Sequence, residues 1–185
     1  MEAIASAFVL VAISEMGDKT QLLAFTLAAR FRRPWLVMAG ICVATVLNHA
    51  LASSAGSWVA AQISPRLLAG VLGLTFLAFG VWTLKPDTLD DQGQTARFGP
   101  FVTTTLLFFL AEMGDKTQLV TVALAAKFHH VVLVTTGTTL GMLVTDGLAV
   151  FIGERLATTV AMVWIRRVAA GLFFLFGVLS LWSML

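Results

Sequence analysis

The sequence predicts an all-α integral membrane protein with six transmembrane helices, arranged as two three-helix repeats of inverted topology. Three observations lead to this prediction. The chain of 185 residues is 58% hydrophobic and only 12% charged, and its mean hydropathy of +0.91 lies far from that of a soluble domain. A polar motif of seven residues occurs twice. The basic residues of the loops are divided unequally between alternate connections.

Six segments are apolar over about 20 residues, which is the length that a helix needs to cross the hydrocarbon layer. In chain order they are Ala3–Ala29, Pro34–Ala60, Pro65–Leu84, Pro100–Ala126, Val131–Gly153 and Ile165–Met184. Residues 85–99 hold the extended polar stretch, and their aspartates lack the spacing of a calcium-binding loop. We therefore expect a first repeat at 1–84, a solvated cytoplasmic linker at 85–99 and a second repeat at 100–185.

The two halves are related by a fixed offset. The motif Glu15–Gln21, E-M-G-D-K-T-Q, returns unchanged 97 residues later as Glu112–Gln118, and 12 of the 17 positions from Glu15 to Phe31 are identical in the second copy. Paired glycines occur at the same offset in the following helices, and we expect them to be close-packing positions: Gly40 with Gly137 and Gly56 with Gly153. The chain is thus a tandem duplication of a three-helix unit.

The loop charges indicate that the second repeat is inverted. Three crossings are an odd number, so the second unit enters the membrane from the opposite side. Outside the motifs, the connections after the first, third and fifth helices carry eight basic residues: Arg30, Arg32, Arg33, Lys85, Arg97, Arg155, Arg166 and Arg167. The other side carries only Arg66 and Lys127. The positive-inside rule places the first set in the cytoplasm and both termini outside.

Each motif places two carboxylates and an ammonium inside an apolar segment. On one continuous helix, Glu15, Asp18 and Lys19 would share a face, and inverted symmetry would bring this face to its copy near the midplane. A purely structural interpretation is an intrahelical salt bridge in each copy, Glu15–Lys19 and Glu112–Lys116. On insertion scales, placing one ionised residue near the bilayer centre costs roughly 3 kcal/mol, so six such residues cost on the order of 18 kcal/mol. Two lysines pair with only two of four acids, so we favour a functional site.

The charge and the ligand types predict the substrate. Four carboxylates and two ammonium groups sum to −2, which matches one divalent cation or two protons. The motifs hold carboxylate, hydroxyl and amide oxygens and no Cys or His, which favours calcium, manganese or magnesium over copper and zinc. We expect the cation ligands to be Glu15, Asp18, Thr20, Gln21, Glu112, Asp115, Thr117 and Gln118, with Lys19 and Lys116 tuning the charge. The four acids would carry protons when the cation has left.

The second and fifth helices add polar residues at matching positions, Asn48–His49 and Thr145–Asp146. They could support the lysines or form a proton path, and the alternative is an interhelical hydrogen bond that fixes packing. Gly17 lies between the acids of the first motif, as its counterpart does in the second. Such a glycine could admit a close neighbour or mark a break in the helix, and the sequence leaves both interpretations open.

The doubled motif resembles the signature of a family. Two E-x-G-D-K-T copies, at Glu15–Thr20 and Glu112–Thr117 of a six-helix chain, are similar to the small cation/proton exchanger family that contains the Golgi calcium/manganese transporters of eukaryotes and bacterial manganese exporters. The resemblance covers all six helices and implies exchange of Mn²⁺ or Ca²⁺ for protons, with the motif acids as ligands. The short central loop is typical of a bacterial member, so the resemblance implies the inner membrane and manganese export.

The sequence therefore predicts a secondary antiporter that exports a divalent cation by alternating access, and not an enzyme. We expect no permanently bound cofactor. The expected partners are the cation, protons and the lipid bilayer; no nucleic acid is expected, because the net charge is only +2, and a homo-oligomer is compatible with the sequence. The rival functions are a cation channel without proton coupling, an intramembrane aspartyl protease and a structural membrane subunit. The paired lysines disfavour the protease, because they would keep its acids ionised.

Overall fold

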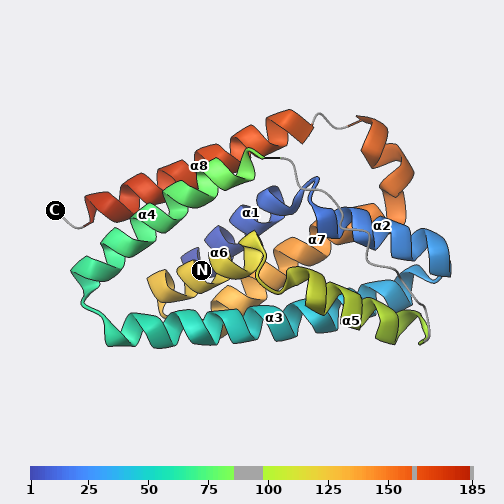
Figure 1. The fold of residues 1–185 in the computed structure, drawn as a ribbon, viewed down its shortest axis with the longest axis horizontal. Helices are drawn as coiled ribbons and strands as arrows, with labels where there is room; N and C mark the ends of the chain where they lie inside the picture. The colour runs from blue at the N-terminus through green and yellow to red at the C-terminus, as the bar shows by residue number, and fades with distance from the viewer. Residues whose placement is uncertain (86–97, 160–161, 184–185) are drawn as a thin grey trace.

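A computed structural model describes residues 1–85, 98–159 and 162–183 of the chain, and these residues form eight helices and no strand (Figure 1). The all-α prediction is confirmed for this part of the protein. The helices of the first half are α1 Glu2–Glu15, α2 Lys19–Phe31, α3 Pro34–Gln62 and α4 Pro65–Thr83. Those of the second half are α5 Pro100–Glu112, α6 Lys116–Phe128, α7 Val131–Thr159 and α8 Met162–Trp182. The predicted linker lies outside the described residues from 86 to 97.

Each motif breaks its helix. The sequence predicted apolar segments over Ala3–Ala29 and Pro100–Ala126 and left open whether the motif glycine interrupts them. The structure decides for a break in each: α1 ends at Glu15 and α2 begins at Lys19, with three residues between them, and α5 and α6 are divided in the same way. The cause is the motif glycine. Gly17 has a φ of 82° and Gly114 a φ of 76°, a left-handed conformation that glycine adopts without a Cβ clash.

Three of the described helices are long and apolar enough to cross a membrane. The spans that meet this measure are Pro34–Gln62, Pro65–Thr83 and Val131–Ile152, while α5 is apolar but shorter. Large apolar side chains also face outward, including Leu51 and Leu74, which are 62% and 65% exposed. These observations are those of a membrane protein, since such a surface is unfavourable in water.

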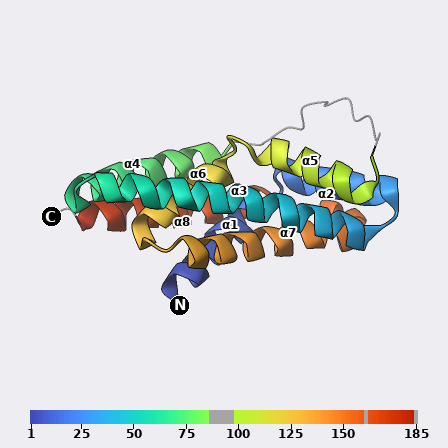
Figure 2. The ribbon, with the colours of Figure 1, turned by 90° about the horizontal axis from the view of Figure 1, so that it is seen from below.

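The two halves pack into each other. Helix α3 of the first half lies along α5 and α6 of the second, and α7 lies along α1 and α2; the remaining pair, α4 and α8, pack side by side (Figures 1 and 2). Helices α3 and α7 contact each other and are antiparallel. Ser53 near the end of α3 bonds Thr135 near the start of α7, and Trp35 at the start of α3 meets Phe151 near the end of α7.

The close-packing glycines repeat this relation residue by residue. A Cβ atom at Gly40 would lie 2.8 Å from the carbonyl oxygen of Phe101, and one at Gly137 would lie 2.6 Å from that of Ile4. Phe101 and Ile4 are themselves 97 positions apart. The prediction for Gly40 and Gly137 is confirmed, and Gly56 likewise lies against α6. Gly153 is outside the residues whose packing is described.

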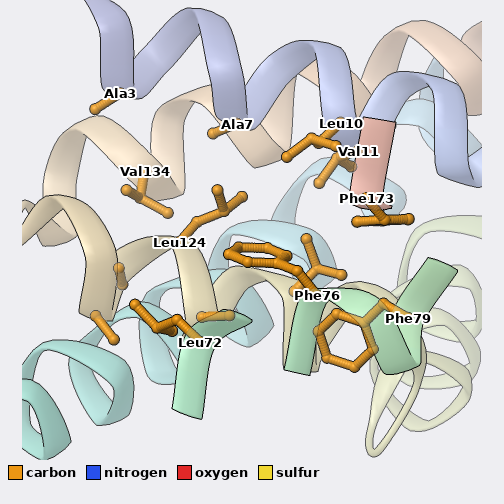
Figure 3. Packing of buried hydrophobic residues seen from close by; sticks show 14 of the residues in the cluster. Ala3, Ala7, Leu10, Val11, Leu72, Phe76, Phe79, Leu124, Val134 and Phe173 are labelled. Atoms are coloured by element: carbon orange, nitrogen blue, oxygen red, sulfur yellow. The ribbon is translucent and has the colours of Figure 1, made fainter. Parts of the chain in front are cut away.

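Two apolar clusters surround the centre. One joins α1, α4, α6, α7 and α8 with the end of α3, and Figure 3 shows Phe76 of α4 beside Phe173 of α8 and Leu124 of α6. The other cluster joins α2, α3, α5 and α7 around Leu27, Ile41 and Phe108. The motif breaks lie between these clusters, because α1 and α6 contribute to the first cluster whereas α2 and α5 contribute to the second. A rigid apolar frame therefore holds the polar centre from both sides.

Gly56→Ala is expected to destabilise the protein by roughly 1–3 kcal/mol, the usual range for overpacking. A Cβ atom there would collide with the main chain of Val122, which has no rotamer to change. Gly171→Ala is the matched control, because a Cβ on this α8 glycine meets nothing within 4 Å. Thermal unfolding in detergent should show a lower Tm for the first variant only. Equal Tm values for both variants would contradict the packing described here.

Candidate functional site

The two helix breaks are built by the motif residues themselves. Asp18 is the N-cap of α2, and its carboxylate accepts a hydrogen bond of 2.6 Å from the Lys19 N–H. The Gln21 side-chain oxygen accepts a hydrogen bond of 2.8 Å from the Gly17 N–H. The second copy has the same bond, from the Gly114 N–H to Gln118, also at 2.8 Å. The glutamine of each motif thus closes the turn that its glycine opens.

The lysines pair across the two repeats. Lys19 Nζ lies 2.9 Å from an oxygen of Asp115, and Lys116 Nζ lies 2.6 Å from an oxygen of Asp18. The expected one-face stripe of Glu15, Asp18 and Lys19 does not form, because the break separates α1 from α2 and changes the direction of the chain. Each motif lysine in fact balances the aspartate of the other copy.

Hydrogen bonds from two threonine hydroxyls hold Glu15 in the site. Its side chain is fully buried, and it accepts hydrogen bonds from the hydroxyls of Thr20, at 2.8 Å, and Thr117. One carboxylate oxygen each of Glu15, Asp18 and Asp115 lie within 4.8 Å of one another, and all three residues are buried. Three such oxygens are a suitable ligand set for a hard divalent cation. The two repeats therefore contribute to one cluster.

Glu112 differs from its counterpart. It is as buried as Glu15, yet neither of its carboxylate oxygens receives a hydrogen bond from any residue in the described parts of the chain. It is also not a member of the three-acid cluster. The two halves of the site are thus unequal, although their motif sequences are identical.

The polar residues of α3 and α7 are divided between the site and its surroundings. Gln21 donates to the main-chain oxygen of Thr145 at 3.1 Å, which holds α7 against the first break. The neighbouring Asp146 is fully buried and lies close enough to Glu15 and Glu112 for their charges to interact. Asn48 donates to the carbonyl of Phe109 at 3.0 Å and so holds α3 against α5.

His49 is also fully buried, and no described residue bonds either ring nitrogen. The structure therefore brings the motif residues and Asp146 together, gives Asn48 and Thr145 hydrogen bonds between helices, and leaves the part of His49 in the site a prediction. The ligand roles of Thr20, Gln21, Thr117 and Gln118 also stay predictions. The amide oxygens of both glutamines already bond the glycine N–H groups of the breaks.

The sequence interpretation missed the exchange of lysine partners between repeats. A signal for it was present in the motif, because Asp at an N-cap followed by Gln three positions on is a helix-start pattern. Read in that way, each aspartate begins a new helix whose first residue is the lysine. The two starts then face each other once the halves pack together.

Comparisons with known proteins identify relatives of the chain. The family model described as "Divalent cation/proton antiporter GDT1" matches residues 3–91 and 100–185. A Vibrio cholerae protein named "Putative manganese exporter" is 44% identical over 176 residues, which cover 95% of this chain and 88% of the relative. The Saccharomyces cerevisiae protein "Divalent cation/proton antiporter GDT1" is 24% identical over 229 residues, which cover 94% of this chain and 81% of the relative. No solved structure matches the chain.

Proposed function

The chain belongs to the divalent cation/proton antiporter family, and from this premise we propose that it exports Mn²⁺ from the cytoplasm in exchange for protons. The family assignment makes it a cation transporter of the membrane and not an enzyme. The choice of Mn²⁺ is supported by the relative from Vibrio cholerae, whose name is that of a manganese exporter. The oxygen-only ligand set is also compatible with Ca²⁺.

The single observation that carries the proposal is the three-acid cluster. Glu15, Asp18 and Asp115 come from both repeats and converge at the helix breaks. Broken helices are the usual place for cation sites in repeat-built transporters, because the end of a helix presents groups that its own hydrogen bonds do not use. In the proposed cycle these three acids hold either the cation or protons, and Glu112 carries a proton when the cation has left, which links release of one to uptake of the other.

Alternating access would follow from the repeat architecture. The antiparallel contact of α3 with α7, and the glycine contacts at the offset of 97, support two three-helix units of opposite orientation in the membrane. In this proposal each broken pair, α1–α2 and α5–α6, completes one crossing, so that there are six. The loop charges orient both termini outside. Rocking of one repeat against the other would expose the cluster to each side in turn.

Proteoliposomes provide the test of this proposal. The purified protein is reconstituted, and luminal pH is followed with a trapped dye while Mn²⁺, Ca²⁺ or Mg²⁺ is added outside. We expect proton release from the lumen with Mn²⁺, and its loss in the double variant Glu15→Gln, Glu112→Gln. Mn²⁺ flux without any proton movement would instead identify a channel. Proton movement that survives in the double variant would refute the assignment of the site.

A further inference from the structure

We propose that α3 and α7 enclose a proton path which leads from Thr135 to Asp146, apart from the cation cluster, and which opens on one side of the membrane only. The inference rests on the proposed exchange, and it names the route by which protons reach the centre. It is carried by the residues along the contact of these two helices.

The polar residues follow the α3–α7 contact turn by turn. At one end, the Thr135 hydroxyl bonds Ser53 Oγ at 3.0 Å and also contacts the main-chain oxygen of His49 at 3.4 Å. Because the helices are antiparallel, one turn inward along both places His49 at the level of Thr139. The next turn of α3 brings Thr45, which is level with Met142 of α7, and Asp146 lies one further turn along α7. The polar side chains therefore pass from α7 to α3 and back to α7, where the last of them is Asp146.

These side chains are buried and lack partners. His49 and Thr45 are fully buried and Thr139 is 6% exposed. Within the described part of the structure, no hydrogen bond reaches the His49 ring nitrogens, the Thr45 hydroxyl, the Thr139 hydroxyl or the Asp146 carboxylate. Buried polar atoms are normally bonded to protein or to ordered water. Successive turns are about 5.4 Å apart, so one water molecule between turns would link them.

The residue types suit a relay of protons. A hydroxyl or a water molecule accepts a proton on its oxygen and passes on the proton that it held. Imidazole accepts on one ring nitrogen and releases from the other. One proton taken up at Thr135 therefore displaces one proton at each following group, and the last is received by the Asp146 carboxylate. The donor in the bulk solvent loses one proton, Asp146 gains one, and no group between them, Thr135 included, changes its net protonation.

The repeat itself supplies an internal comparison. The positions 97 residues away from Ser53, Thr45, Thr135 and Thr139 are occupied by Val150, Met142, Met38 and Cys42. Met142 lies opposite Thr45 on α7, while Val150, Met38 and Cys42 occupy the mirrored half of the contact, and none of these three offers a hydroxyl or carboxylate. The α3–α7 packing therefore does not require polar residues. Their presence in one half only indicates a path that leads to one side.

The position of the open end identifies that side. Thr135 is only partly buried and lies one turn from Val131, the first residue of α7. The path from Thr135 to Asp146 spans 11 residues, or about 16 Å of helix, roughly half of the hydrocarbon layer. In the orientation proposed above, the start of α7 is extracytoplasmic. The path would thus admit protons from outside, as an exporter driven by inward protons needs.

The test compares isosteric variants in the proteoliposome assay. Thr45→Val combined with Thr139→Val removes two hydroxyls of the path and keeps the side-chain shape. Thr138→Val is the matched control, because the Thr138 hydroxyl bonds the main-chain oxygen of Val134 in its own helix at 2.9 Å. We expect the double variant to lower the initial rate of Mn²⁺-driven proton movement at least tenfold. Mn²⁺ affinity, measured by calorimetry in detergent, should stay within twofold of the wild type.

Other results would overturn the proposed path. A double variant that moves protons at the wild-type rate would exclude the path, and so would an equal loss in Thr138→Val. Loss of Mn²⁺ affinity together with the rate would show that these hydroxyls support the fold or the cation site instead. The wild-type protein distinguishes failure of the proposed exchange from failure of the path alone. If Mn²⁺ drives no proton movement in the wild type, both the exchange and the path are refuted.

Discussion

Lys116→Met is expected to lower the free energy of unfolding by about 3–5 kcal/mol, the range observed when one partner of a buried ion pair is removed. The Lys116 side chain is 6% exposed, and its ammonium lies 2.6 Å from an oxygen of the fully buried Asp18 side chain. Methionine keeps the length and apolar stem of the side chain but leaves the carboxylate without this cation. Thermal unfolding in detergent at neutral pH should show a clear drop in Tm.

The repeat provides the control for this variant. Lys19 makes the equivalent pair with Asp115, but its side chain is 28% exposed, so water can replace part of the lost interaction. Lys19→Met should therefore cost no more than about 1 kcal/mol. Adding Asp18→Asn to Lys116→Met should restore part of the stability, because the charge that was left behind is then removed. Equal losses for the two lysine variants would contradict the difference in burial.

Glu15→Gln is expected to weaken Mn²⁺ binding about 100-fold, or about 2.7 kcal/mol. Glu15 is the member of the three-acid cluster that two threonine hydroxyls hold in place. The amide keeps the shape of the side chain and one acceptor oxygen but removes the negative charge that attracts the ion. Titration calorimetry on the detergent-solubilised protein measures the change directly.

The matched control is Glu112→Gln. This acid is equally buried, has the same motif neighbours in sequence and lies outside the cluster. We expect its replacement to weaken Mn²⁺ binding less than about tenfold, or about 1.4 kcal/mol. A larger loss for Glu112→Gln than for Glu15→Gln would show that the cation binds in an arrangement other than the described one.

The sequence predicted the all-α class and the starts of several helices, because the signals for these are local. Apolar length and proline positions place the starts of α3, α4 and α5 at Pro34, Pro65 and Pro100, where the structure has them. The offset of 97 also predicted which glycines pack closely. The close packing of Gly40 and Gly137 can be predicted from the sequence alone, because the same small residue at equivalent places in two repeats indicates a shared contact.

The helix breaks and the ion pairs were harder to predict. A glycine within a helix is compatible with continuation or with a left-handed turn, and Gly17 alone does not decide between them. The choice depends on Gln21, which bonds the Gly17 N–H only once the turn has formed. The difference in hydrogen bonding between Glu15 and Glu112 could not be predicted from the sequence either. Their motifs are identical, so the difference arises from tertiary contacts such as the bond from Thr117.

The reciprocal ion pairs bear on the ancestry of the chain. Lys19 pairs with Asp115 and Lys116 with Asp18, so each motif needs the other copy to balance its charge. Because the motifs are identical, two separate copies of one half of the chain could make the same two bonds with each other, provided that their long helices packed antiparallel, as α3 and α7 do. The ion pairs are those expected of a homodimer of identical halves. Fusion of two such genes would fix both orientations in one chain, after which the halves were free to diverge at positions such as His49 and Asp146.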